Sequence, residues 1–200
     1  MIAIILAGGF GTRMLPITDT LSKCLVPVNG EPALYRILKQ LNSLDCSKIV
    51  VLTGYLGQQV KQAIHNFGEF VEKIILIDTP ESFSPAQRLL SSAEYWKEAD
   101  KLLETNDLIK HVNSNDEKIR VVVQNRNPGN CITEKDGKTR YFEVKDTRHS
   151  QVELGYWVID SSSFYLELLK QQDLVRALVE ISSRNFVVST LIDDYYSLSN

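Results

Sequence analysis

A glycine-rich turn directly after an apolar strand constrains the fold of this chain more than any other feature. Residues 2–6 form a continuous apolar run, which is typical of a parallel strand buried on both faces. The turn Gly8-Gly9-Phe10-Gly11-Thr12-Arg13 follows after one alanine. Because glycine has no Cβ, the backbone N–H groups of such a turn can surround an anion, and the arginine adds positive charge. The sequence therefore predicts a parallel sheet that carries a phosphate-binding loop at the carboxyl ends of its strands.

The segments that follow repeat the order of helix and strand. The pattern predicts a helix from Pro32 to about Leu44, a strand over 49–52, a helix over 58–67 and a strand over 74–77. We expect the three strands to be parallel neighbours, with the helices covering the sheet. The buried face of the first helix is expected to consist of Leu34, Ile37, Leu38 and Leu41.

The second half of the chain predicts more β structure. Helical patterns extend from Pro85 to Trp96 and over 101–112, and one amphipathic helix is predicted over 164–181. Strand patterns lie at 119–123, 141–144, 152–159 and 186–188. The expected buried residues of the 164–181 helix are Leu168, Leu169, Val175, Leu178 and Val179. The predicted fold class is α/β: a Rossmann-like, mostly parallel sheet with flanking helices and a smaller antiparallel β element.

Composition narrows the function classes. The 200 residues, 44% of them hydrophobic and 24% charged, predict one compact domain over 1–200. A net charge of −3 gives no reason to expect nucleic acid or an anionic membrane as a partner, and no apolar run is long enough to span a bilayer. Cys24, Cys46 and Cys131 have neither zinc-ligand nor disulfide-framework spacing, so we expect a cytoplasmic location. Lys23 is expected to favour the thiolate of Cys24.

The glycine turn differs from two well-known phosphate-binding motifs. A dinucleotide-binding turn would have a third glycine where Met14 stands, and an acidic residue after the second strand, where Thr53-Gly54-Tyr55 stands. A Walker loop would continue into Gly-Lys-Ser/Thr, which is missing here. A dinucleotide-dependent oxidoreductase is therefore the third choice among the function hypotheses.

Two sequence blocks resemble the signature of the sugar-phosphate nucleotidyltransferases. Residues 6–18 follow the family pattern L-A-G-G-x-G-T-R-L-x-P-L-T, and residues 23–28 follow the end of its P-K-x-L-x-P-V block. Ser22 stands where that family usually has proline. The resemblance implies the nucleotide-diphospho-sugar transferase fold. It also implies an enzyme that joins a nucleoside triphosphate to a sugar 1-phosphate and releases pyrophosphate.

The resemblance also assigns roles to residues of the two blocks. Arg13 would hold the triphosphate and the leaving pyrophosphate, and Lys23 the attacking sugar phosphate or the α-phosphate. The alternative is that both are solvated loop charges and that the glycines are ordinary turn residues. The residues expected to bind the nucleotide are Leu6, Ala7, Gly8, Gly9, Gly11, Thr12 and Gln87.

Further site residues are assigned in three other segments of the chain. Gln87 lies in the segment 83–90 that resembles the base-binding segment of the family, but it could equally belong to the first turn of an ordinary helix, and Arg88 could be a surface charge. The residues expected to bind the sugar lie in two strand-like segments and are Glu143, Lys145, Glu153 and Gly155. The alternative for Glu143 and Glu153 is a solvated strand face.

Magnesium is the implied cofactor, and Asp107 is the candidate ligand because the family places an aspartate at the end of a central strand. Residues 103–112 fit a helix as well, and the interval up to Val121 is too short for both elements. An active but divergent enzyme is the leading hypothesis, and a nucleotidyltransferase-like domain that binds ligand without turnover is the alternative. Residues could also have been lost from the chain. The expected partners are a nucleoside triphosphate and a sugar 1-phosphate, and the oligomeric state is left open, a homo-oligomer included.

Overall fold

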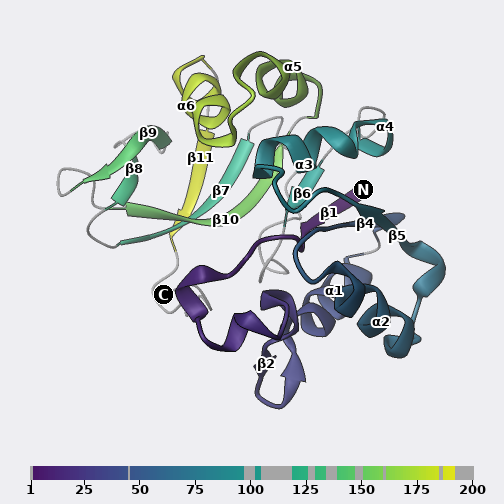
Figure 1. Cartoon of the computed structure of the whole chain (residues 1–200). Coiled ribbons are helices and arrows are strands. Elements are labelled where there is room, and N and C mark those ends of the chain that lie inside the picture. Colours follow the sequence, from purple (N-terminus) through teal and green to yellow (C-terminus); the bar gives the residue numbers. More distant parts are fainter. Residues whose placement is uncertain are drawn as a thin grey trace.

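The computed structural model is an α/β fold built on one twisted sheet (Figure 1). It describes residues 2–44 and 46–96, and beyond these the segments 102–104, 119–125, 129–133, 139–146, 151–159, 161–184 and 187–191. The strands follow one another across the sheet in the order β11-β7-β10-β6-β1-β4-β5, and β8 and β9 pair beside this path. The strands of the sheet are β1 (Ile2–Leu6), β4 (Lys48–Thr53), β5 (Ile74–Asp78), β6 (Leu102–Glu104), β7 (Ile119–Asn125), β8 (Gly129–Thr133), β9 (Thr139–Asp146), β10 (Gln151–Ile159) and β11 (Val187–Leu191).

The predicted parallel core is confirmed. β1 pairs in parallel with β4, in the register Ile2 opposite Lys48 to Leu6 opposite Leu52, and β4 pairs in parallel with β5. The antiparallel part is formed by β10, which runs antiparallel to both β6 and β7, and by the pair β8 and β9. The short hairpin β2 (Pro27–Val28) and β3 (Glu31–Pro32) lies outside this sheet.

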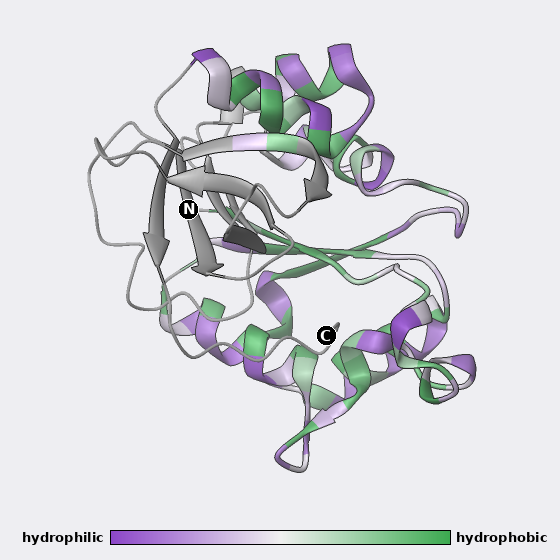
Figure 2. Ribbon diagram, turned by 90° about the vertical axis from the view of Figure 1, so that its left-hand side faces the viewer, coloured by the Kyte–Doolittle hydropathy of each residue, from purple (hydrophilic) through white to green (hydrophobic). Residues whose placement is uncertain are grey.

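Two layers of helices cover the parallel strands because successive side chains of β1 point to opposite faces. Ala3 and Ile5 pack with the helices α1 and α2, whereas Ile4 packs with the helices of the other layer. The predicted buried face of α1 is confirmed in full. Figure 2 shows the sheet between the two layers of helices. The helices are α1 (Ala33–Ser43), α2 (Gly57–Phe67), α3 (Pro85–Ser91), α4 (Ala93–Trp96), α5 (Ser161–Gln171) and α6 (Leu174–Arg184). The 3₁₀ turns are η1 (Thr12–Met14), η2 (Ile17–Asp19), η3 (Lys23–Leu25) and η4 (Val71–Lys73).

Two helix predictions differ from the structure. The pattern at 101–112 predicted a helix, but Leu102–Glu104 forms β6, which pairs in parallel with β1. Residues 105–112 lie outside the described residues. A short apolar segment fits a helix or a strand equally well, and the neighbouring strand decides between them. The single helix predicted over 164–181 is two helices, which separate at Gln172 in a left-handed conformation with φ of 52°.

The break has a local cause, since Asp173 caps the second helix. Its carboxylate accepts a hydrogen bond from the backbone N–H of Arg176 at 2.9 Å, as residues before a helix commonly do. The break changes which residues face the sheet: Leu168 and Leu178 are buried as expected, but Leu169 and Val175 are 41% and 39% exposed. Phe164, Ala177 and Ile181 complete the buried face.

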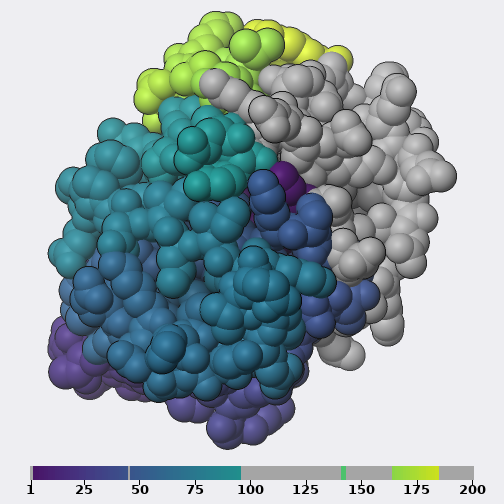
Figure 3. Space-filling view, turned by 90° about the vertical axis from the view of Figure 1, so that its right-hand side faces the viewer, coloured from purple at the N-terminus to yellow at the C-terminus, as the bar shows by residue number. Residues whose placement is uncertain are grey.

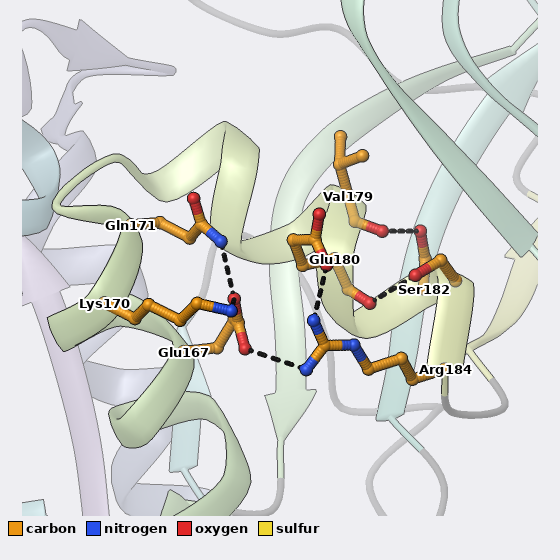
Figure 4. Close-up of polar contacts among 8 residues, drawn as sticks. Glu167, Lys170, Gln171, Val179, Glu180, Ser182 and Arg184 are labelled. Atoms are coloured by element: carbon orange, nitrogen blue, oxygen red, sulfur yellow. Dashed lines mark hydrogen bonds and ion pairs between the residues drawn. The ribbon is translucent and has the colours of Figure 1, made fainter.

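Polar contacts also join the two helices (Figure 4). The carboxylate of Glu167 on α5 lies 3.4 Å from a guanidinium nitrogen of Arg184 on α6, and Gln171 donates to the same carboxylate at 2.7 Å. In the space-filling view, α5 and α6 lie above a face that is built largely by residues 50–96 (Figure 3). No helix among the described residues is both long and apolar enough to cross a membrane.

Candidate functional site

The glycine loop lies where the sequence predicts it, at the carboxyl ends of β1 and β4. The backbone N–H of Ala7 donates to the carbonyl of Leu52 at 2.9 Å, and the N–H of Tyr55 donates to the carbonyl of Gly8 at 3.2 Å. These two bonds extend the pairing of the strands into the loop. A Cβ added at Gly9 would meet no atom within 4 Å, so the loop is open at this point.

Gly11 joins the two sequence blocks. It has φ of +67°, which favours glycine, and its carbonyl accepts the hydroxyl of Thr18 at 2.8 Å. A Cβ at Gly11 would lie 2.8 Å from Cγ2 of Thr18 and 3.1 Å from Cβ of Lys23. The second block therefore packs directly on the glycine loop, which brings Lys23 beside it.

Arg13 and Lys23 form a pair of neighbouring cations. Arg13 lies exposed on η1, and Lys23 lies half-buried on η3. Burial lowers the pKa of Lys23, and the nearby charge of Arg13 lowers this pKa further. No ion pair between described residues includes either side chain. Two like charges with no ion-pair partner among the described residues favour an anion between or above them.

Sequence reasoning missed the role of Arg88, whose description as a surface charge was wrong. The side chain is only 4% exposed and lies under the glycine loop. One terminal nitrogen donates to the carbonyl of Thr53 at 2.9 Å and to the hydroxyl of Thr79 at 2.6 Å, and the other donates to the carbonyl of Glu81 at 2.9 Å. Arg88 thereby ties the ends of β4 and β5 to the loop before α3.

Two glycines make room for this guanidinium. A Cβ at Gly8 would lie 2.0 Å from a terminal nitrogen of Arg88, and a Cβ at Gly54 would lie 1.9 Å from it. Burial lowers the pKa of Arg88, although the charge of Glu81 opposes this shift. Gly8 therefore has a packing role that its position in a phosphate-binding motif does not indicate.

Gln87 takes part in a capping box at the start of α3. Its side-chain carbonyl accepts the N–H of Ser84 at 2.9 Å, and the hydroxyl of Ser84 accepts the N–H of Gln87 at 3.2 Å. This contact corresponds to the alternative of an ordinary first turn. Reading of a base edge by Gln87 stays a prediction.

The residues assigned to the sugar lie on two strands, and their side chains are outside the described residues. Glu143 and Lys145 belong to β9, and Glu153 and Gly155 belong to β10. Glu153 stands opposite Val123 of β7, and the pairing is irregular between Glu153 and Trp157. Their contact with a sugar stays a prediction.

The magnesium assignment also stays a prediction, because Asp107 lies outside the described residues. Its position in the sequence is three residues past Glu104, the last residue of β6, and β6 is the neighbour of β1. Within the part of the chain that the structure describes, no three His, Cys, Asp or Glu side chains are grouped so that they could hold a metal ion.

Lys23 was expected to favour the thiolate of Cys24, and its charge does lower the pKa of this thiol, but the net shift is in the opposite direction. Burial raises the pKa of the Cys24 thiol, and this effect exceeds the opposing contributions of a hydrogen bond with Ser22 and of the charge of Lys23. The cation beside the thiol is thus available for another anion.

The family assignment follows from the match of the sequence to known proteins. Residues 2–141, which include both blocks of the site, match the family model described as nucleotidyl transferase. The chain belongs to the nucleotidyl transferase family. The glycine loop, Arg13 and Lys23 all lie within the matched segment.

Individual relatives are distant and mostly longer. The chain is 24% identical over 204 residues to the bifunctional IPC transferase and DIPP synthase of Aquifex aeolicus, a match that covers 97% of this chain and 47% of the relative. It is 30% identical over 107 residues to the glucose-1-phosphate thymidylyltransferase of Streptomyces griseus, covering 54% of this chain and 30% of the relative. The matches therefore span less than half of the length of these curated relatives.

The solved structures confirm the fold. A crystal structure from Bacillus anthracis, described as a glucose-1-phosphate thymidylyltransferase in complex with sucrose, superposes with a TM-score of 0.80. The superposition covers 98% of this chain and 88% of the other, at 19% sequence identity. The nucleotide-diphospho-sugar transferase architecture predicted from the two blocks is thus present.

Proposed function

We propose that this protein transfers a nucleotidyl group from a nucleoside triphosphate to a sugar 1-phosphate, with release of pyrophosphate. The observation that carries the proposal is the contact of the two sequence blocks at Gly11, which brings Lys23 beside the loop that holds Arg13. Relatives named as glucose-1-phosphate thymidylyltransferases support the choice of acceptor.

The proposed reaction is an in-line displacement at the α-phosphorus. A phosphate oxygen of the sugar 1-phosphate forms the new P–O bond, and the bond between the α-phosphorus and the bridging oxygen of the pyrophosphate breaks. Negative charge spreads over the phosphoryl oxygens, so catalysis requires positioned cations rather than a nucleophilic side chain. Arg13 suits the leaving pyrophosphate because its planar guanidinium can donate two parallel hydrogen bonds.

Lys23 suits the attacking phosphate or the α-phosphate in this proposal. Its compact ammonium group is half-buried, which strengthens its interaction with an anion relative to an exposed lysine. An anion bound near Lys23 would also raise the lysine pKa again and keep the side chain charged. Asp107 is the proposed ligand for Mg²⁺, which would neutralise phosphate charge when bound.

The test is a pyrophosphate-release assay over the four common nucleoside triphosphates and a panel of sugar 1-phosphates with Mg²⁺. Phosphocholine and other non-sugar phosphates belong in the panel as alternative acceptors. We expect at least one pair to react, and Asp107→Asn to abolish turnover in a folded protein. The matched control is Asp173→Asn, which keeps an oxygen acceptor for the cap of α6 and lies far from both blocks in the sequence.

Calorimetry with and without Mg²⁺ separates an enzyme from a binding module. Nucleotide binding that does not depend on Mg²⁺, together with no pyrophosphate from any pair, would contradict the proposed activity. That result would leave the alternative of a domain that binds a nucleotide or a sugar phosphate without turnover.

A further inference from the structure

The side chain of Gln59 holds the segment that precedes Lys23. Gln59 lies in the first turn of α2, and its amide forms two hydrogen bonds with the backbone of the loop. The carbonyl oxygen Oε1 accepts the N–H of Ser22 at 2.9 Å, and the amide nitrogen Nε2 donates to the carbonyl of Thr20 at 2.8 Å. Because both ends of one rigid amide are used, the contact fixes the orientation of the loop as well as its distance.

Tyr55, just before α2, supports the same segment and connects it to the glycine loop. Its hydroxyl donates to the carbonyl of Asp19 at 3.1 Å, and its backbone N–H donates to Gly8. Its ring also packs on Phe10, with 4.9 Å between the ring centroids. The connection between β4 and α2 therefore contacts both loops that carry the cation pair.

The backbone at residue 22 explains why an acceptor is required there. Ser22 is 1% exposed, so water cannot accept a hydrogen bond from its backbone N–H. Without an acceptor from the protein, this N–H would be buried with no hydrogen-bond partner, which is costly. Its φ of −56° is close to the value that a proline ring fixes, and its ψ of 134° is one that proline also adopts. A proline at position 22 would have no N–H to satisfy, and its ring would set φ. Serine needs another residue to accept its N–H and to hold its backbone in this conformation.

We propose that Gln59 is the positioning residue for Lys23, and that its two hydrogen bonds do for Ser22 what a proline ring would do at that position. This inference rests on the proposed function, in which Lys23 holds a phosphate. Lys23 directly follows Ser22, and its Cβ lies close to Gly11, so a shift of the segment moves the ammonium group relative to the glycine loop. Displacements near 1 Å in a preorganised site can cost about 100-fold in rate.

The test is a double-mutant cycle between Gln59→Ala and Ser22→Pro. We expect Gln59→Ala to lower kcat/KM about tenfold, a part of the loss that full misplacement would cause. Ser22→Pro alone should also lower kcat/KM, because the ring carbon takes the position of the N–H that faces Oε1 of Gln59. The double variant should return to within about threefold of wild type, because the ring then sets φ and the alanine leaves room for it.

Matched variants separate positioning from a general loss of stability. Gln58→Ala, one residue earlier on α2 and exposed, should leave kcat/KM unchanged. In a Lys23→Ala background, Gln59→Ala should have no further effect on kcat/KM, because the group that it positions is gone. A residue that only stabilised the fold would lower activity equally in both backgrounds.

Amide hydrogen exchange of the segment around residue 22 gives a readout that does not depend on activity. We expect Gln59→Ala to remove the protection of this segment, and Ser22→Ala, which keeps the N–H, to retain it. If wild type releases no pyrophosphate from any substrate pair, the proposed function fails. Amide hydrogen exchange alone then tests whether Gln59 holds the segment around residue 22. Retained protection in Gln59→Ala, unchanged kcat/KM, or a double variant as slow as the product of the two single effects would each overturn the inference.

Discussion

Charged side chains are arranged differently around the glycine loop and in the α5–α6 hairpin. In the hairpin, Glu167 is buried and its carboxylate lies near Lys170 and Arg184, and Arg184 also donates to Glu180 at 2.7 Å (Figure 4). The positive and negative charges of these side chains thus neutralise one another. Around the loop, neither Arg13 nor Lys23 forms an ion pair with a described residue.

The difference distinguishes charges that hold the fold from charges that can hold a ligand. A paired charge contributes a small amount of stability and exerts little field on a third group. An unpaired cation beside another cation costs stability, and this cost is recovered when an anion binds. Arg88 belongs to neither class, because it is a buried cation whose partners are carbonyl and hydroxyl oxygens.

The largest effect is expected for Arg88→Met, which tests whether this cation belongs to the fold. Methionine fills part of the space but leaves three oxygens without their donor, so the free energy of unfolding should fall by about 4 kcal/mol. Urea denaturation followed by circular dichroism measures the change. Arg88→Lys should lose less, because it keeps the charge and one donor group. A loss below about 1 kcal/mol would show that the bonds are replaced by water.

Arg13→Ala is expected to reduce kcat about 100-fold, since Arg13 would stabilise charge that develops in the transition state. The melting temperature should stay close to that of wild type, because Arg13 is exposed and has no ion pair among the described residues. The matched control is Lys48→Ala, which removes an exposed cation at the opposite, amino end of β4. Equal effects of the two variants on turnover would make Arg13 an ordinary loop charge.

Glu167→Gln should produce the opposite pattern, with a change in stability and none in turnover. Its partners Arg184 and Lys170 are more than half exposed, so the loss should be about 1 kcal/mol. Thermal unfolding measures the stability, and the pyrophosphate assay measures the turnover. Reduced turnover at temperatures where the variant is folded would connect the hairpin to the site and remove the contrast between the two regions.

The smallest effect concerns the pH dependence of Lys23. Burial and the charge of Arg13 place the folded-state pKa of Lys23 below the ordinary lysine value of 10.5, so kcat/KM should fall on the alkaline side below pH 10.5. The unfolded chain binds this proton more tightly, so the contribution of Lys23 to stability should rise with pH between the lowered pKa and 10.5. Arg13→Gln should move the alkaline limb to higher pH. A limb that does not move would mean that the two cations do not interact.

Local sequence determined the parallel core and the place of the loop. Buried residues follow one another directly in β1 and recur at helical spacing in α1, so the pattern of apolar residues predicts which positions are buried. The glycines mark the end of the strand. These signals depend on residues that are close together in the chain. The break between α5 and α6 was also encoded locally, in Asp173, but the apolar periodicity continues through it and concealed it.

Only the tertiary structure decided that Leu102–Glu104 is a strand, that Arg88 is buried and that Gln59 holds Ser22. Arg88 bonds the carbonyl of a residue 35 positions away, and Gln59 bonds the N–H of a residue 37 positions away. Every residue other than proline has both backbone groups, so such partners leave no pattern of residue types in the sequence. Two sequence blocks could thus indicate the chemistry, whereas the contacts that hold the loops around Arg13 and Lys23 depended on how distant backbone groups meet after folding.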